Sequence, residues 1–515
     1  MPAHHEPAMR TTFIDCAWLL AEPGHSPALA NQRVVVEAGR IAAIEPLPGQ
    51  PAGPRRLVLP ALANAHDHGR TFRTATLGAF GQPLETWLPY GSVAPGADAY
   101  LCAATSFARS VRKGVARLMV HYTRVQGLTG YVDEAEAVAR AARDVGVQVG
   151  FAVAMRDRQG IAYCDDARVL DALRPGIRET VAARLSARAV PPAAQIALVE
   201  EVAQRVASAE GGSLAPHMVV QYGPTAVHWC SEPLLAAIAQ ASADNGRPVH
   251  MHLLETPYQR QWADAAHPGG IVAYLDAIGL LSPRLTLAHC TWTRPDELAL
   301  LAERGVTIAV NTSSNLALKS GIAPLAEMLR QGCRVAMGLD GSAFDEDDDA
   351  LREMRLAYQL HRGWGFEEAV TRAQLWQFAA RNGRRSVQGA RPGNAPDDAQ
   401  AGGRIAVGEP ADLVTLDWDR LDDDALRPDV DPLDLLLARG NGSHIDEVMV
   451  AGRTVVQGGR VTGVDEPALR AALTAEVRAR IAEQPQATAE WRATLDALSE
   501  DLAPFYRRGM FVSCC

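Results

Sequence analysis

The sequence predicts an α/β fold in which a (β/α)8 barrel, a TIM barrel, carries a small β-sandwich domain. Three observations predict it. Short β-rich runs alternate with Ala-, Leu- and Arg-rich helical stretches through residues 57–385. Eight of these runs have the apolar character of buried parallel strands. Hairpin-like patterns occur in residues 1–56 and again in residues 404–462. We therefore expect two sequence-distant halves to form one β-domain beside the barrel.

The first predicted barrel strand is the uninterrupted apolar run 57–63, which leads into Asn64-Ala65-His66-Asp67-His68. Seven further strands are expected, separated by helical stretches: residues 116–121, 147–153, 218–222, 248–252, 285–289, 306–310 and 334–340. In a parallel barrel the carboxyl ends of the strands meet at one face. Polar residues that follow several strands are therefore brought together there.

Two segments follow the predicted barrel strands without belonging to them. Residues 386–403 are rich in Pro, Gly, Asp and Gln, which predicts a flexible linker between the barrel and the β-domain. Residues 463–515 contain two amphipathic helical stretches, which we expect to pack on the barrel or on a partner subunit. The acidic run 345–349 lacks the spacing of a calcium-binding loop, so we expect a solvated loop.

The charge balance argues for small-molecule chemistry. The 515 residues carry 50 basic and 60 acidic side chains, a formal charge of -10, which provides no basic surface for nucleic acid or an anionic membrane. We find no secretory signal and no apolar run long enough to span a bilayer, and we expect a cytoplasmic protein. The eight cysteines form no C-x-x-C pair, which favours reduced thiols, with Cys514-Cys515 in an exposed tail.

Polar residues lie at or just beyond the ends of four predicted strands: His66 and His68 at the first, His252 with Glu255 at the fifth, His289 at the sixth and Asp340 at the eighth. Histidines combined with a carboxylate suit Zn²⁺ or Fe²⁺ and leave a coordination position for water. Such a water ionises near neutral pH. The pattern therefore indicates a hydrolytic metal centre at the carboxyl face of the barrel.

Five motifs, in family order, resemble the amidohydrolase superfamily. The similar branch contains S-adenosylhomocysteine/methylthioadenosine deaminases, guanine deaminase and triazine hydrolases such as atrazine chlorohydrolase. The resemblance covers most of the chain, and it is carried by residues 59–68, 249–256, 287–290, 311–324 and 338–341.

The resemblance implies that one divalent metal, Zn²⁺ in the first place and Fe²⁺ as the alternative, is bound by His66, His68, His252 and Asp340. In this branch the ligand is the histidine three positions before the glutamate, which selects His252. Strand alternation places His250 on the same side, so a swapped role stays open. Binuclear relatives carry a lysine at the end of the fourth strand, where this chain has residues 221–224, Gln-Tyr-Gly-Pro.

The implied reaction is hydrolytic deamination of a small nitrogen heterocycle of the pterin, purine, pyrimidine or triazine type. Metal-bound hydroxide would attack the amine-bearing ring carbon and ammonia would leave. Asp340 would accept a proton from the bound water and return it to the departing amine. Glu255 would protonate the adjacent ring nitrogen, and His289 would orient the attacking oxygen. The family also implies a homodimer.

Five further residues are candidates for substrate binding: Trp87, His121, Arg156, His228 and Asn315. Trp87 lies in a segment that supplies an apolar wall in relatives, although core packing explains it equally well. Arg156 follows the third strand and is a candidate anchor for a carbonyl or carboxylate group. For His121 and His228, a hydrogen-bonded core histidine is the more common explanation.

The sequence departs from the family in two substrate-facing loops. Residues 342–349 replace an asparagine-rich loop, and the second strand ends in His121-Tyr122-Thr123-Arg124. These changes leave the metal chemistry intact and argue against nucleoside substrates. Two alternatives therefore stay open. One is hydrolysis that expels an alkylamine, halide or carbamate/urea group, and the other is a catalytically silent barrel that serves as a binding scaffold.

Overall fold

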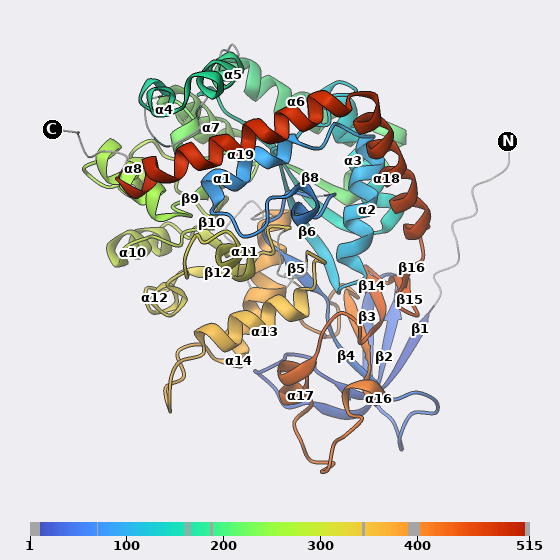
Figure 1. Ribbon diagram of the computed structural model, residues 1–515. Coiled ribbons are helices and arrows are strands. Elements are labelled where there is room, and N and C mark those ends of the chain that lie inside the picture. Colours follow the sequence, from blue (N-terminus) through green and yellow to red (C-terminus); the bar gives the residue numbers. More distant parts are fainter. Residues whose placement is uncertain are drawn as a thin grey trace.

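The computed structural model describes residues 11–69, 71–158, 160, 163, 166–185, 189–341, 346–389 and 402–509, which form two eight-stranded sheets (Figure 1). The barrel sheet is parallel, and its strands follow one another in chain order: β5 (Leu62–Asn64), β6 (Val115–Tyr122), β7 (Gln148–Met155), β8 (Met218–Pro224), β9 (Val249–Leu253), β10 (Leu285–His289), β11 (Thr307–Val310) and β12 (Arg334–Met337). The predicted barrel is confirmed.

The second sheet joins strands from both ends of the chain. Its spatial order is β16-β15-β14-β13-β4-β1-β2-β3. The strands are β1 (Thr12–Leu19), β2 (Leu29–Glu37), β3 (Arg40–Pro46), β4 (Arg56–Pro60), β13 (Leu413–Asp417), β14 (Ile445–Val450), β15 (Arg453–Gln457) and β16 (Arg460–Val461). The two halves expected to combine do so through the antiparallel pairing of β4 with β13, and they form one continuous hydrogen-bonded sheet.

The apolar run 57–63, predicted as one barrel strand, is divided between the two sheets. Its first part is β4, which pairs with β1 and β13 in the second sheet. At Ala61 the backbone N–H donates to the Asp412 carbonyl, still in the second sheet, whereas the N–H of Leu62 donates to the Gly114 carbonyl in the barrel. An apolar run of this kind fits a buried strand in either sheet. The apolar character of residues 57–63 therefore could not show where the chain passes from the second sheet into the barrel.

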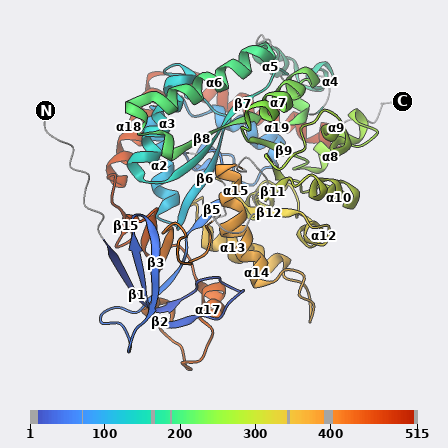
Figure 2. The ribbon, with the colours of Figure 1, turned by 180° about the vertical axis from the view of Figure 1, so that it is seen from behind.

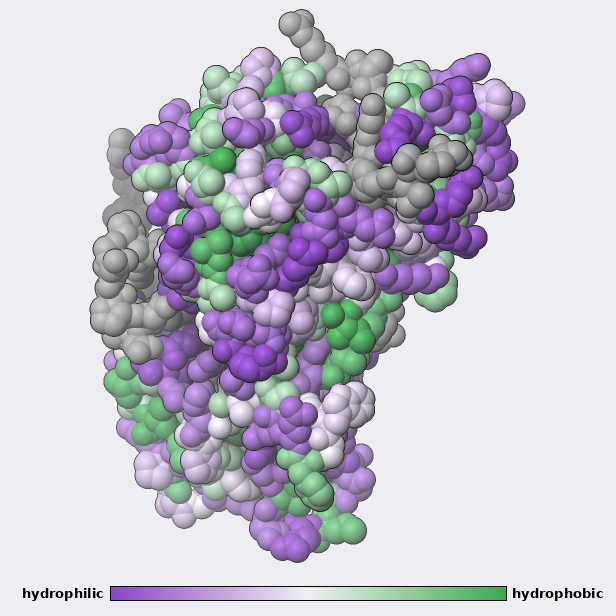
Figure 3. All heavy atoms as spheres, turned by 90° about the vertical axis from the view of Figure 1, so that its left-hand side faces the viewer, coloured by the Kyte–Doolittle hydropathy of each residue, from purple (hydrophilic) through white to green (hydrophobic). Residues whose placement is uncertain are grey.

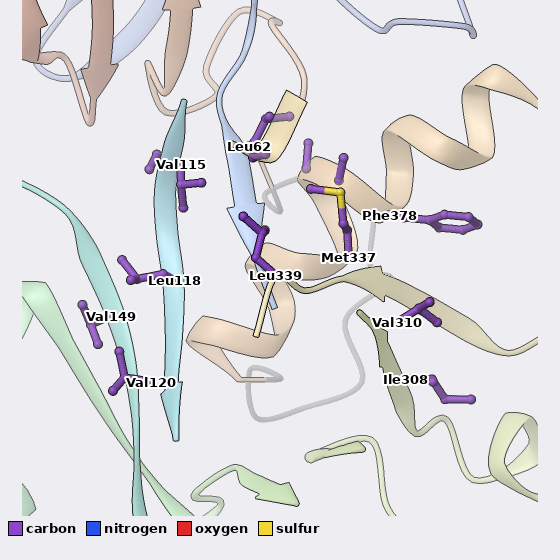
Figure 4. Close-up of a cluster of buried hydrophobic side chains, with 14 of the residues drawn as sticks. Leu62, Val115, Leu118, Val120, Val149, Ile308, Val310, Met337, Leu339 and Phe378 are labelled. Carbon is purple, nitrogen blue, oxygen red and sulfur yellow. The ribbon is translucent and has the colours of Figure 1, made fainter. Parts of the chain in front are cut away.

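Branched apolar side chains of the strands fill the barrel wall. Figure 4 shows Leu62, Val115, Leu118 and Val149 on β5 to β7, with Ile308 and Val310 on β11 and Phe378 on the surrounding helical layer. Most of these side chains are fully buried. Their burial fixes the directions in which the carboxyl ends of the strands point.

Helices surround the barrel and extend beyond it (Figure 2). Their bounds are α1 (Leu84–Trp87), α2 (Ala99–Val111), α3 (Tyr131–Val145), α4 (Asp166–Ala172), α5 (Pro175–Leu185), α6 (Pro192–Ser208), α7 (Glu232–Asn245), α8 (Pro257–Ala266), α9 (Ile271–Ala277), α10 (Pro295–Glu303), α11 (Thr312–Ala317), α12 (Leu325–Arg330), α13 (Ala350–His361), α14 (Arg372–Trp376), α15 (Gly383–Gln388), α16 (Trp418–Leu421), α17 (Pro432–Arg439), α18 (Glu466–Glu483) and α19 (Pro485–Arg507). Short helices η1 to η6 lie at Thr74–Leu77, Leu88–Ser92, Ala209–Gly212, Ala215–His217, Val227–Trp229 and Gln377–Asn382.

The last two long helices pack on the barrel domain. Helix α18 contacts α2, and α19 contacts α1, α4 and α5. In Figure 1, α19 is the red helix that crosses the barrel. Leu495, Leu498 and Leu502 of α19 lie in one buried cluster with Trp87 and Tyr90. Helix α19 thereby covers the segment that carries Trp87.

Two expectations about loops need correction. The predicted linker starts at residue 386, but α15 continues to Gln388, and the Ser386 hydroxyl donates to the Ala65 carbonyl at 3.2 Å. Residues 390–401 lie outside the described residues. The solvated acidic loop is wrong for Asp348 and Asp349, which are both buried. Asp348 accepts hydrogen bonds from Arg109 and Ser110, and such paired burial is not readable from a charge run.

The thiols agree with the reduced state where they are described. Cys16, Cys102, Cys230, Cys290 and Cys333 are free and buried. Cys164, Cys514 and Cys515 lie outside the described residues, as do residues 342–345. The face of the molecule in Figure 3 is mostly hydrophilic, with hydrophobic residues in separate small areas. Within the described part of the chain, every helix is too short or too polar to cross a bilayer.

Asp412 joins the two sheets through a buried ion-pair cluster. Its Oδ2 accepts from Arg117 of β6 at 2.7 Å and also from Arg384 of α15, and its Oδ1 accepts the N–H of Ala451. Burial opposes its charge, but Arg117 and Arg384 outweigh this effect and lower the pKa of Asp412 to about 2. The stabilisation, about 2 kcal/mol from this shift, is present above the ordinary pKa near 4 and is lost as the pH falls through 2.

Asp412→Ala should lower the free energy of unfolding by about 3–5 kcal/mol, because it leaves two buried guanidinium groups unpaired. Urea denaturation at pH 7 measures this loss. The control is Asp429→Ala, which breaks an exposed pair with Arg427 and should cost less than about 1 kcal/mol. Equal losses in the two variants would contradict the role given to Asp412.

Candidate metal and active site

Asn64 sets the start of the site by joining the ends of the first and last barrel strands. Its Oδ1 accepts the backbone N–H of Leu339 at 2.9 Å, just after β12, and its Nδ2 donates to Asp67 Oδ2 at 2.7 Å. The N–H of Asp340 donates to the His66 carbonyl at 2.9 Å. The segments that carry His66, His68 and Asp340 are therefore fixed against each other by backbone and amide hydrogen bonds.

Three of these side chains converge with two further histidines. The ligand-capable atoms of His66, His68 and Asp340 lie within 4.8 Å of one another, and so do those of His66, His252 and His289. Asp340 Oδ1 is 3.2 Å from His68 Nε2 and 3.4 Å from His66 Nε2. The structure thus brings together all four residues that the sequence analysis proposed as metal ligands.

The hydrogen bonds behind these rings leave lone pairs facing inward. His252 Nδ1 lies 2.7 Å from the Thr225 carbonyl, and His68 Nδ1 lies 2.9 Å from the His121 carbonyl. A carbonyl only accepts, so each Nδ1 carries the hydrogen and each Nε2 presents a lone pair. The two Nε2 atoms face each other at 3.3 Å, where two acceptors cannot hydrogen-bond.

A cation satisfies this set of acceptors. His66 Nε2 is buried and has no hydrogen-bond partner among the described residues, and it points to the same place as His68, His252 and Asp340. Burial lowers the pKa of His66 to about 3 and that of His252 well below its ordinary value, so both rings are neutral at pH 7. Imidazole nitrogens with one carboxylate fit a divalent metal of the zinc type.

His250 lies behind the candidate ligands. Its Nε2 is 2.8 Å from His66 Nδ1, and the two rings are stacked with an interplanar angle of 15°. A hydrogen on His66 Nδ1 donated to His250 leaves His66 Nε2 as the inward lone pair. This geometry gives His250 a supporting position behind His66. It therefore favours His252 as the candidate ligand over His250, whose role as ligand strand alternation had left open.

Asp340 and His289 are held by two consecutive residues of helix α11. Ser314 Oγ donates to Asp340 Oδ2 at 2.6 Å, which leaves Oδ1 toward the histidines. Asn315 Oδ1 lies 2.9 Å from His289 Nδ1, and Asn311 Nδ2 lies 3.2 Å from the same nitrogen. Asn315, expected as a substrate contact, thus supports His289, and His289 Nε2 is turned toward Glu255 Oε2 at 3.6 Å.

Glu255 has the environment of a proton donor. Its side chain is buried, and burial raises the pKa of this carboxyl group to about 7. Ser320 Oγ donates to Glu255 Oε1 at 3.2 Å, while the distance to His289 is too long for a direct hydrogen bond. Glu255, His289 and Asp340 form a third close group, so the two carboxyl groups flank one location.

The other substrate candidates take different positions. Trp87 is buried and lines a cavity of about 80 Å³ together with His68 and Phe72. The His121 ring stacks on His252 with centroids 4.9 Å apart, and its Nε2 bonds the Gly223 carbonyl, so it supports the metal-side histidines.

His228 belongs to none of the close groups of ligand-capable side chains among the described residues, and Arg156 contacts a different part of the chain. His228 packs edge-on against Tyr163 and Trp229, and burial lowers its pKa to about 3. The Arg156 side chain is exposed, and the bonds at this position join its backbone to Gln195. The structure does not bring Arg156 into the group of ligand-capable residues described above.

Several residues that hold the site were not predicted. The Thr225 backbone carbonyl, which contacts His252 Nδ1, could not be predicted from the sequence because every residue has a backbone carbonyl. Ser314 and Asn311 lie in the motif 311–324, which was recognised, but their individual roles depend on which way α11 turns. Asn64 had a usable signal, since an amide two residues before an H-x-H pair, at the end of a predicted buried strand, requires hydrogen-bond partners.

At Gly338 the site leaves no room for a side chain. A Cβ added there would lie 2.1 Å from Asn311 Oδ1 and 2.9 Å from the Cβ of His66. We expect Gly338→Ala to displace both residues and to lower the free energy of unfolding by about 1–3 kcal/mol, with weaker metal binding. Gly49→Ala, where a Cβ meets open space, is the control. Melting temperature and metal content measure the difference, and unchanged values in Gly338→Ala would contradict the steric argument.

A parallel barrel with this histidine and aspartate group at the carboxyl ends of its strands defines a metal-binding barrel protein of the hydrolase type. The chain belongs to the amidohydrolase family, whose profile matches residues 57–455.

Two deaminases are similar in sequence to this chain, one over about half of it and the other over most of it. A 5'-deoxyadenosine deaminase of Methanopyrus kandleri is 33% identical over 245 residues, which are 47% of this chain and 54% of that protein. A 5-methylthioadenosine/S-adenosylhomocysteine deaminase of Desulfovibrio desulfuricans is 29% identical over 81% of this chain and 83% of the relative. The match thus spans just over half the length of the first of these relatives.

The solved structure of an adenosine deaminase from Xanthomonas campestris with bound zinc has the same fold. Its TM-score is 0.69 at 23% sequence identity, over 92% of this chain and 98% of that chain.

Proposed function

We propose that the protein is a metal-dependent aminohydrolase that releases ammonia from a small nitrogen heterocycle. The observation that carries this proposal is Glu255, a buried carboxyl group with a raised pKa beside the convergent histidines and Asp340. A protonated carboxyl group at this place suits transfer of a proton to a ring nitrogen. The activities for which the two relatives are named make an adenine-type purine the first ring to test.

His66, His68, His252 and Asp340 would hold one divalent metal, with Zn²⁺ the first candidate and Fe²⁺ the second. The inward lone pairs of the rings and the single carboxylate support this ligand set. When bound, such a metal supplies Lewis acidity and makes water a stronger acid.

The residues of the chain divide the proton transfers. Asp340 accepts a proton from the attacking water and returns it to the departing amine, while the Ser314 hydroxyl holds its other oxygen. Glu255 donates its proton to the ring nitrogen next to the attacked carbon, so negative charge does not accumulate there, and it takes up the second proton of the attacking oxygen when the amine leaves. His289, fixed through Nδ1, presents Nε2 toward the attacking oxygen. Burial of all three side chains excludes bulk water from these transfers.

We also propose a cytoplasmic homodimer. The family resemblance supports the dimer, and the free cysteines among the described residues support a reducing compartment. Light scattering of the purified protein tests the dimer, and a monomer mass at all concentrations would contradict it.

Ammonia release tests the reaction. Metal-replete protein is incubated with amino-substituted purines, pterins, pyrimidines and triazines, and ammonia is measured together with the absorbance change of each ring. We expect release from at least one ring class, loss of it after chelation, and recovery on adding Zn²⁺ or Fe²⁺. Metal-loaded protein that releases no ammonia, and instead releases halide, alkylamine or carbamate from such rings, would replace this function. Protein that binds no stoichiometric metal would remove it.

A further inference from the structure

One turn of helix α11 holds two residues of the proposed reaction, Asp340, which transfers a proton, and His289, which orients the attacking oxygen. Ser314 donates to Asp340 Oδ2 at 2.6 Å, and Asn315 lies 2.9 Å from His289 Nδ1. Because the two residues are neighbours on a six-residue helix, a shift of its first turn moves Asp340 and His289 together. The position of α11 therefore determines the orientation of both the Asp340 carboxylate and the His289 ring.

Glu353 of α13 binds the beginning of that helix. Its Oε1 accepts the backbone N–H of Ser313 at 3.0 Å, and its carboxyl group also interacts with the backbone of Thr312. The first N–H groups of a helix have no partner within the helix, so an acceptor placed there fixes where the helix starts. The Glu353 side chain is only 2% exposed, so this contact is shielded from water.

The backbone of Glu353 is anchored in the first turn of α13. The N–H of Glu353 donates to the Asp349 carbonyl at 2.9 Å, and Asp349 caps α13 through Arg352. Asp349 Oδ2 also accepts the N–H of Gly442 at 2.8 Å. A chain of hydrogen bonds thus runs from the segment before β14, through α13 and Glu353, to α11 and the site.

We propose that Glu353 is a positioning residue for the reaction. It contacts α11 and sets the geometry of Asp340 and His289 through Ser314 and Asn315. This inference rests on the proposed function. Keeping a carboxyl group in such a buried place costs desolvation, which a purely structural cap at the surface would avoid. Supporting residues of this kind change metal affinity or activity by about 10- to 100-fold when they are removed.

The test compares Glu353→Ala, Glu353→Gln and the wild-type full chain, all loaded with metal. We expect Glu353→Ala to lower kcat by about 10- to 100-fold with KM changed less than about threefold. The visible absorption spectrum of the Co²⁺-loaded protein should change in Glu353→Ala, because Asp340 loses its fixed orientation. Glu353→Gln keeps an acceptor for the Ser313 N–H and should restore both kcat and the spectrum.

Two variants make the comparison interpretable. Glu368→Ala removes an exposed glutamate after α13 and should match the wild type. Glu353→Met fills a similar volume without an acceptor and replaces the alanine variant if the alanine cavity prevents folding. An unchanged kcat and Co²⁺ spectrum in Glu353→Ala or Glu353→Met would overturn the proposal. So would a lowered melting temperature with no change in either readout.

The Co²⁺ spectrum separates this inference from the proposed function. If the wild type releases ammonia from none of the rings, the proposed function fails, and the spectra of the Glu353 variants still report whether Asp340 has moved. If ammonia is released and the spectra and kcat of the variants equal the wild type, the function stands and the positioning role of Glu353 falls.

Discussion

Glu255→Gln should lower kcat/KM for ammonia release by about 10²- to 10⁴-fold while the protein keeps its metal. Glutamine has nearly the same shape but cannot give a proton to the ring nitrogen. The ligand-capable side chains His66, His68, His252 and Asp340 are untouched by the change, so metal content measured after gel filtration should equal that of the wild type. Steady-state kinetics on the best ring of the panel gives the loss.

The pH dependence provides a second readout of Glu255. Burial raises its pKa to about 7, and the active form in our proposal is the protonated one. The rate should therefore fall as the pH rises above about 7, by about tenfold per pH unit. The residual activity of Glu255→Gln should lack this alkaline decline. A Glu255→Gln variant with full activity, or with the same alkaline decline, would remove the proton-donor role.

His252→Ala should lose its stoichiometric metal and all detectable turnover. The structure places His252 Nε2 opposite His68 Nε2 at 3.3 Å, with its Nδ1 hydrogen bound to the Thr225 carbonyl. Removing this ring takes away one of the four side chains that we propose as metal ligands. Metal analysis after dialysis against metal-free buffer, followed by titration with Zn²⁺, measures the loss.

His250→Ala is the matched control for that experiment, since it removes the same side chain two residues earlier on the same strand. His250 Nε2 lies 2.8 Å from His66 Nδ1, and among the described residues His250 belongs to none of the close groups of ligand-capable side chains. We expect metal to remain, with affinity or activity weakened by about 10- to 100-fold. If His250→Ala lost the metal and His252→Ala kept it, the ligand assignment of these two histidines would be reversed.

The residues around the site were predictable to different degrees. Six residues lie at or just beyond strand ends, and the parallel barrel brings such ends to one face: His66, His68, His252, Glu255, His289 and Asp340. Their convergence therefore follows from strand order alone. The partners of these residues do not follow from it. Asn315 supports His289 and Arg156 stays outside the group, because helix orientation and loop path decide which way a side chain points.

The sequence by itself determined the parallel barrel, the pairing of N- and C-terminal strands in a second sheet, and the group of ionisable residues at the carboxyl ends. These three features depend on apolar periodicity and on the order of strands along the chain, and both can be read directly from the sequence. Only the tertiary structure divided the run 57–63 between two sheets, buried Asp348 and Asp349, and separated the positions of His250 and His252. Both histidines lie on the same face of one strand, so their difference arises from the neighbours that each ring meets across the barrel.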